Sequence, residues 1–444
     1  MTLEPANGRP AGLLAAIVLG GFGLLALTAP GGVALLAPVA IGVAVAMRPV
    51  LTTPLIAVTL PFHLHPIGVS SFALSATEIT IGGSVLGMAL RASLDRILHR
   101  RPGLTIVASS ADWIAAAFLA AGLLSLLPSE YLKQSLRELR WLILEPILVF
   151  YAVRLTIQTD RAVFATLWAV VLAGVVASVA ALADPLTSKT FLDLNTRPAG
   201  PYPSPNHLAL FLERTAAVGL ALALFTRESR WAGGATSFVS LIVLRTLSLG
   251  AWLGLGASSL VLFALRGRRW AIGAAGGLVI ATALALMVLP PERTLDRLSP
   301  EHGTALFRIE IWTAAVHMLA DHPVLGVGLD NFLYQYRSRY MLPEAWEEPN
   351  ISHPHNWVLD FWLSLGLPGL AAGVTAVIWI GRAAHRRFRH PASASDAALG
   401  AASLGVLLAF LIHGSLDNSY FLVDLAIVWW ILIGLLARPR SGAA

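Results

Sequence analysis

Residues 162–182 read AVFATLWAVVLAGVVASVAAL, a stretch without a charged side chain. A helix needs about 20 apolar residues to cross the hydrocarbon core of a bilayer, and this run is long enough to do so. Similar runs recur along most of the chain, separated by short segments that carry the arginines. Their repetition predicts a polytopic membrane protein.

The overall composition agrees with a lipid-embedded chain. Of its 444 residues, 56% are hydrophobic and 13% are charged, whereas soluble proteins carry about 25% charged residues. The formal net charge is +6, but the basic residues form short clusters between apolar runs, a pattern that sets membrane topology and does not indicate nucleic-acid binding. Because the chain has no cysteine, disulfides, thiol catalysis and cysteine metal sites are excluded.

The fold class follows from the apolar runs. Bare backbone polar groups are not tolerated in lipid, and the runs do not alternate as barrel strands do, so we expect all of them to be helical. Some early runs are short and adjacent, and re-entrant pairs would lower the number, so we predict an all-α bundle of about 12–14 transmembrane helices. The candidate spans are 11–29, 31–47, 50–66, 72–90, 110–127, 138–155, 162–182, 206–225, 232–248, 250–265, 270–289, 357–381, 396–414 and 419–437.

Arginine clusters predict the orientation of these spans. If the spans cross the membrane alternately, all five clusters fall on one side, which should be the cytoplasmic side. The clusters are Arg91, Arg96, Arg100 and Arg101; Arg227 and Arg230; Arg266, Arg268 and Arg269; Arg382, Arg386, Arg387 and Arg389; and Arg438 with Arg440. We therefore expect a multi-pass protein of the inner (cytoplasmic) membrane.

The predicted topology divides the chain into three parts. Residues 1–289 form an N-terminal transmembrane bundle, 290–356 a large periplasmic or extracellular loop, and 357–444 the C-terminal transmembrane helices with a short cytoplasmic tail. Loops as long as 290–356 usually have a function. Within it, Thr304 to Ala320 has the periodicity of an amphipathic helix, with Arg308, Trp312 and Ala315 opposite its apolar face.

The segment His353-Pro354-His355-Asn356 lies where the large loop re-enters the membrane. Histidine titrates near neutral pH and is the commonest general base, so His355 is a candidate catalytic residue. The alternative is a pair of interfacial histidines at a helix start, with Asn356 as the N-cap. Two histidines could also bind a metal, but no third ligand has a matching spacing, so we expect neither a metal nor another cofactor.

Arginines predicted on the same side could bind phosphate, because the guanidinium fork suits phosphate oxygens. They are Arg308 on the expected loop helix, Arg337 and Arg339 further along, and Arg197 in the loop at 184–205. For Arg337 and Arg339, solvated loop charges are the favoured interpretation.

The segment from Gly200 to His207, GPYPSPNH, contains three prolines and forms a stiff entrance to the next predicted span, with Asn206 near its end. Glu213 and Arg214 follow inside that span. Charges in lipid are costly and usually paired or functional, and a mutual or inter-helix salt bridge is the favoured interpretation here.

Several motifs together resemble the O-antigen ligase family, which also contains O-antigen polymerases. His355-Asn356 is followed after nine residues by Gly366-Leu367-Pro368-Gly369, similar to the family pattern H-N-x9-G-x-x-G. Upstream, Arg308 and Trp312 match R-x-x-x-W, and the segment 322–328, His-Pro-Val-Leu-Gly-Val-Gly, matches H-P-x-x-G-x-G. The resemblance covers roughly residues 195–420.

The resemblance implies a metal-independent, inverting glycosyltransferase of lipopolysaccharide or cell-envelope polysaccharide biosynthesis. Its donor would be a glycan on undecaprenyl diphosphate, and its acceptor a lipid A–core sugar for a ligase or another lipid-linked glycan for a polymerase. His355 would deprotonate the acceptor hydroxyl and Arg308 would hold the diphosphate. Asn356, His353 and Asn206 are further candidates for substrate binding.

The chain departs from the family at one position. The family usually has Ser-Arg-Gly at the outer end of a mid-chain span, whereas this sequence has Ser248-Leu249-Gly250. Arg245, one helical turn earlier, or Arg197 could supply the missing charge. The substitution also leaves open an inactive relative that acts as a scaffold, and a lipid or solute transporter is a further alternative from a different class.

Overall fold

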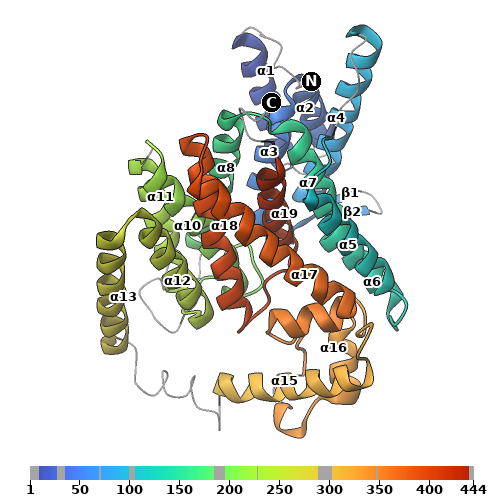
Figure 1. The fold of residues 1–444 in the computed structure, drawn as a ribbon. Coiled ribbons are helices and arrows are strands. Elements are labelled where there is room, and N and C mark those ends of the chain that lie inside the picture. The colour runs from blue at the N-terminus through green and yellow to red at the C-terminus, as the bar shows by residue number, and fades with distance from the viewer. Residues whose placement is uncertain are drawn as a thin grey trace.

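The computed structural model describes residues 10–27, 36–69, 72–99, 106–184, 196–227, 229–288, 303–346 and 349–439. Almost all regular structure in these ranges is helical, which confirms the prediction of an all-α polytopic bundle. Within the described residues, five helices are long and apolar enough to cross a membrane by themselves, and further apolar helices are shorter. Helices α10, α18 and α19 lie in the middle of the bundle, and α15 crosses one end of it (Figure 1).

The N-terminal helices largely follow the predicted spans. They are α1 (Pro10–Ala26), α2 (Leu36–Met47), α3 (Thr52–Thr59) between the short 3-10 helices η2 (Pro49–Leu51) and η3 (Leu60–Phe62), α4 (Ala76–His99) and α5 (Ser110–Leu124). Two runs that we expected to be wholly helical have one end in a strand: run 50–66 at its last residue and run 72–90 at its start. Strand β1 (Pro66–Val69) pairs antiparallel with β2 (Phe72–Ser75), because a hairpin satisfies backbone groups between α3 and α4 as well as a helix would.

The central helices carry the apolar core. They are α6 (Leu132–Leu139), a π-helical turn η4 (Arg140–Leu144), α7 (Glu145–Thr156), α8 (Asp160–Ala183), α10 (Pro205–Phe225), α11 (Ser229–Arg245), α12 (Leu249–Arg266) and α13 (Arg268–Val288). Helix α10 packs against α8, α11, α12 and α18. Its residues from His207 to Gly219 are all buried, which explains why most of this helix is apolar and why its charged residues Glu213 and Arg214 need partners inside the bundle.

The large loop folds as a small helical unit. It contains α15 (Gly303–Asp321), α16 (Phe332–Gln335), the π-helical turn η5 (Tyr336–Tyr340) and the 3-10 helix η6 (Pro343–Ala345). The predicted loop helix is therefore present, and its buried residues Ile311, Ala314 and Met318 form a core with Tyr336 and others of the loop. Ala315, which we expected on the opposite face, is also buried in this core, because the loop packs around more of α15 than one stripe.

Three helices complete the bundle: α17 (Trp357–Arg389), α18 (Ala394–Gly414) and α19 (Val423–Ala437). Helix α17 is interrupted at Gly366, where φ is 70°. This break divides α17 into a short outer part next to the loop and a long part that packs on α18 and α5. The loop from Ser415 to Leu422 between α18 and α19 therefore comes close to the start of α17, where the predicted site lies.

Candidate functional site

His355 is held at the junction of the large loop and α17. Asn356 is the N-cap of α17, and its side-chain oxygen accepts hydrogen bonds from the backbone N–H groups of Val358 at 3.0 Å and Leu359 at 3.3 Å. His355 itself has φ of 51°, a left-handed conformation that is uncommon for residues other than glycine and is often found at functional sites.

The structure brings a carboxylate to His355 that sequence reasoning did not single out. Asp417, in the loop between α18 and α19, places Oδ1 2.8 Å from Nδ1 of His355 and 3.2 Å from Nε2 of His353. Nδ1 of His353 lies 3.0 Å from Ser352 Oγ, so both ring nitrogens of His353 are engaged. No described residue forms a hydrogen bond with Nε2 of His355, so this nitrogen could accept a proton from a ligand in the cavity that His355 lines.

The His355–Asp417 arrangement has the geometry of a general base with its orienting acid. A carboxylate on one imidazole nitrogen fixes the tautomer and stabilises the imidazolium that forms when the other nitrogen takes a proton. Burial would raise the pKa of Asp417, but the adjacent His355 and His353 outweigh this effect and hold that pKa well below its usual range. Asp417 therefore stays ionised as a partner for His355.

Helix α15 forms hydrogen bonds with both the loop that carries Asp417 and the loop that carries His355. Arg308 donates from Nε to the carbonyl of Leu416 at 3.0 Å, next to Asp417. Trp312, one turn later on the same helix face, donates from its indole to the carbonyl of Pro354 at 2.9 Å, next to His355. The spacing R-x-x-x-W thus has a physical meaning: it aligns the aspartate loop with the histidine loop.

The two glycine motifs, at residues 322–328 and 366–369, lie against each other and are joined by backbone hydrogen bonds. Val327 donates its N–H to Leu363 O at 2.7 Å, and Leu367 donates to Val324 O at 2.9 Å. Gly326 and Gly366 both have positive φ at this crossing, and a Cβ on either would meet the opposing backbone. These positions require glycine because two irregular backbones approach each other without room for a side chain.

A cavity of about 380 Å³ opens beside the histidines. It is lined by His353, His355 and Asp417, by Asn206 and His207 at the start of α10, and by three further carboxylates, Glu138, Asp330 and Asp360. This volume suits a sugar unit better than a whole oligosaccharide.

Glu138 on α6 is a further titratable group in the wall of this cavity. Burial, with a contribution from the nearby Asp330, raises the pKa of Glu138 to about 7. Carboxylates in such a wall can accept hydrogen bonds from hydroxyl groups. The cavity is therefore better suited to a hydroxyl-rich ligand than to an anion.

The predicted phosphate-binding arginines do not line this cavity. Arg308 lies beside Asp417, and burial lowers the pKa of Arg308 while Asp417 opposes that change. Arg197 donates to Thr246 O at 2.5 Å and to Asn206 Oδ1 at 2.7 Å, and Arg245 donates to Thr196 O at 3.1 Å. These bonds connect the end of α11, three to four residues before Leu249, to the segment that leads into α10 and to the first turn of α10.

The other charges considered from the sequence have structural partners. Arg339 forms an exposed ion pair with Glu130 at 2.7 Å. Glu213 lies 3.1 Å from Nδ1 of His413, and Arg214 donates to Ser419. The pairing at Glu213 is therefore an inter-helix contact and not a mutual Glu213–Arg214 bridge.

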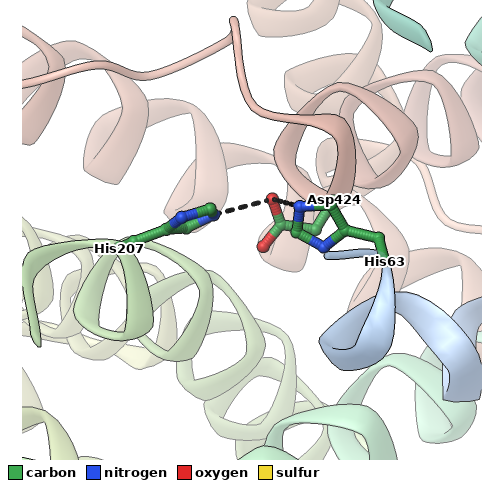
Figure 2. Close-up of side chains that lie close together, drawn as sticks. All are labelled: His63, His207 and Asp424. Carbon is green, nitrogen blue, oxygen red and sulfur yellow. Dashed lines mark hydrogen bonds and ion pairs between the residues drawn. The ribbon is translucent and has the colours of Figure 1, made fainter. Parts of the chain in front are cut away.

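A second His–His–Asp group lies behind the cavity wall. Nε2 of His207 is 3.3 Å and Nε2 of His63 is 3.9 Å from Oδ1 of Asp424 (Figure 2). Both this group and His353–His355–Asp417 have the donor types and spacing that could hold a metal ion. Neither third ligand was visible from the sequence, because Asp417 and Asp424 are distant from the histidines along the chain.

Fold and site together define a multi-pass helical membrane protein with a histidine–aspartate pair where a folded loop meets the bundle. Residues 234–374 match the family model described as O-antigen ligase. A curated protein named O-antigen ligase, from Salmonella typhimurium (strain LT2), is 29% identical over 138 residues, which cover 29% of this chain and 34% of that protein. The predicted resemblance to the O-antigen ligase and polymerase family is thereby confirmed over this region, although the chain spans only about a third of its curated relative.

The matched region contains some of the site but not all of it. Arg308, Trp312, His355 and both glycine turns lie within residues 234–374. Asp417 lies outside it, in a short segment between two apolar spans. Its charge was a usable signal for the residue, though not for its partner, because Asp417 is the one charged residue in the described segment between α18 and α19.

Proposed function

We propose that this protein transfers a glycan from undecaprenyl diphosphate to an acceptor sugar hydroxyl, as an inverting, metal-independent glycosyltransferase. The observation that carries the proposal is Nε2 of His355, free beside the cavity while Asp417 holds Nδ1 at 2.8 Å. A hydroxyl group is a weak nucleophile, and a base placed in this way removes its proton as the new bond forms.

The proposed reaction is a single displacement. The acceptor oxygen attacks the anomeric carbon, its proton passes to Nε2 of His355, and the bond from the anomeric carbon to the diphosphate oxygen breaks. Because one displacement occurs without a covalent intermediate, the anomeric configuration inverts. The resulting imidazolium is stabilised by Asp417.

Negative charge grows on the diphosphate as its bond breaks, and fixed cations stabilise that charge. Arg308 is placed for this role because it is bonded beside the histidine–aspartate pair. Arg197 and Arg245 form a second group of guanidinium ions near Leu249, where the family has an arginine. With these cations available, the proposed step needs no metal ion.

The bundle supports the proposed location of the reaction. A polyprenyl chain must remain in lipid while its diphosphate reaches the site, which favours an active site at the membrane surface. The arginine clusters place the large loop on the non-cytoplasmic side. We therefore place the transfer on the outer face of the cytoplasmic membrane.

Reconstitution tests the proposal and separates a ligase from a polymerase. The full-length protein in lipid vesicles would be given an undecaprenyl-diphosphate-linked glycan, with either lipid A–core or a second lipid-linked glycan as acceptor, in the presence of a chelator. We expect a product of inverted anomeric configuration by NMR with one acceptor, and the acceptor used assigns the subclass. No product with either acceptor, together with solute flux through the vesicles, would favour a transporter instead.

A further inference from the structure

The His63–His207–Asp424 group joins three segments that are far apart in the sequence. His63 follows η3, His207 is in the first turn of α10, and Asp424 is in the first turn of α19. All three side chains are buried, and their candidate ligand atoms lie within 4.8 Å of one another. The two rings and the carboxylate point toward a common centre (Figure 2).

The hydrogen bonds of His63 determine where its proton lies. Nδ1 of His63 is 2.9 Å from the carbonyl oxygen of Leu60, and because a carbonyl only accepts hydrogen bonds, Nδ1 must carry the proton. Nε2 of neutral His63 then presents a lone pair to Oδ1 of Asp424 at 3.9 Å. Two acceptors face each other there, and a positive charge between them would turn this repulsion into attraction.

Among the described residues, only one oxygen of the Asp424 carboxylate has a hydrogen-bond partner, because Oδ1 lies 3.3 Å from Nε2 of His207. Asp424 is fully buried, and Oδ2 has no hydrogen bond to any described residue. The buried Arg214 does not supply one, because it donates to Leu210 O at 2.6 Å and to Ser419 O at 3.0 Å. A buried carboxylate with one unsatisfied oxygen is costly, and a bound cation would remove that cost.

We propose that His63, His207 and Asp424 bind a divalent transition-metal ion such as Zn²⁺. Two imidazole nitrogens and one carboxylate are a frequent donor set for zinc, whereas Mg²⁺ and Ca²⁺ prefer oxygen ligands. The bond from Nδ1 of His63 to a backbone carbonyl is the arrangement that commonly orients a metal-binding imidazole.

The ion would have a structural role that is separate from glycosyl transfer. It would join η3, α10 and α19, and two of these contribute to the cavity wall through His207 and Leu422. The His353–His355–Asp417 group differs because Nδ1 of His353 faces Ser352 Oγ and its rings remain partly exposed. We assign proton transfer to that group and metal binding to the buried one.

Metal titration of the full-length protein tests this assignment. The protein, stripped with a chelator in lipid nanodiscs, would be titrated with Co²⁺, whose visible absorption reports imidazole and carboxylate coordination, and then with Zn²⁺ in competition. We expect a single Co²⁺ per chain. His63→Gln and Asp424→Asn should weaken binding by more than about tenfold, whereas His65→Gln, an exposed histidine two residues from His63, should not.

The second cluster provides the decisive control. His355→Ala should keep wild-type Co²⁺ affinity and the increase in thermal midpoint that Zn²⁺ produces, and this comparison holds even if His63→Gln does not fold. Failure of the wild type to bind Co²⁺ would overturn the proposal, as would loss of binding in His355→Ala. Neither outcome depends on transfer activity, so it leaves the proposed enzymatic function to its own test.

Discussion

The two His–His–Asp groups have the same chemical composition but different surroundings. His353, His355 and Asp417 lie on irregular backbone beside a cavity, and both rings are 21% exposed. His63, His207 and Asp424 lie inside the bundle, with at most 7% of any side chain exposed. In the first group, Nε2 of His355 has no hydrogen bond to a described residue. In the second group, the candidate metal-binding atoms of all three side chains lie within 4.8 Å of one another.

This difference shows that residue type alone does not assign a role. A base must exchange protons with a ligand, so it needs access and an unoccupied nitrogen. A metal site instead needs convergent donors and protection from competing water. The following predictions test whether the two groups can be separated in this way, beginning with the largest expected effect.

Replacing His355 should have the largest effect on transfer. His355→Ala removes the proposed base and should lower kcat by about 10²–10⁴-fold, and it should also lower the thermal midpoint because the buried Asp417 loses its partner. His353→Ala, which removes only a positioning contact, should lower kcat by about tenfold. Equal losses in both variants, measured by single-turnover transfer in vesicles, would contradict the assignment of His355 as the base.

Arg308 tests whether a guanidinium ion beside the pair stabilises the leaving group. Arg308→Ala should lower kcat by about 10²–10³-fold, and Arg308→Lys should restore only part of the rate because an ammonium ion cannot match the guanidinium fork. Arg337→Ala is the matched control, since this exposed loop arginine donates to Asn350 Oδ1 at 3.4 Å, away from the histidine–aspartate pair. A wild-type rate in Arg308→Ala would mean that Arg197 or Arg245, and not Arg308, stabilises the leaving group.

Asp417 should make a pH-dependent contribution to stability in addition to its effect on rate. We expect Asp417→Asn to lower kcat by about 10–100-fold. Because the folded-state pKa of Asp417 is well below its usual value, its contribution to folding stability is present above about pH 4 and is lost as the pH falls below that. The free energies of unfolding of wild type and Asp417→Asn, measured across this pH range, should therefore converge at acidic pH.

Asp330→Asn is a control for which the expected pH dependence of stability has the opposite sign. Burial raises the pKa of Asp330, although Arg137 opposes this change. The folded protein therefore holds the Asp330 proton more tightly than the unfolded chain, and stability falls as the pH rises through the interval between the two pKa values. Asparagine also tolerates the φ of 55° at this position. If the stability difference between wild type and variant changes with pH in the same direction for Asp330→Asn and Asp417→Asn, the interpretation of Asp417 is wrong.

The sequence predicted much of the fold because membrane helices are determined by local composition. Each predicted span corresponds to a helix over most of its length, apart from the ends that form β1 and β2. His355, Arg308 and Asn356 were selected as candidates through local motifs. Asp417 and Asp424 were not, because their contacts join residues that are 62 and 217 positions apart, and a single sequence contains no signal for such pairings.

Trp312 should have the smallest effect and tests how the site is aligned. Trp312→Phe keeps an aromatic ring on α15 but removes the bond to Pro354 O, and a hydrogen bond typically contributes about 0.5–1.5 kcal/mol. We therefore expect kcat to fall about two- to tenfold with little change in KM, because alignment of His355 is loosened and ligand contacts are kept.

Trp379→Phe is the matched control for this loss, since that indole donates to Ser110 Oγ at 2.8 Å on another part of α17. Loss of either bond should lower the thermal midpoint to a similar extent, but only Trp312→Phe should slow transfer. A parallel decrease in transfer for both variants would mean that general stability, and not the alignment of the His355 loop with the Asp417 loop by α15, limits the rate.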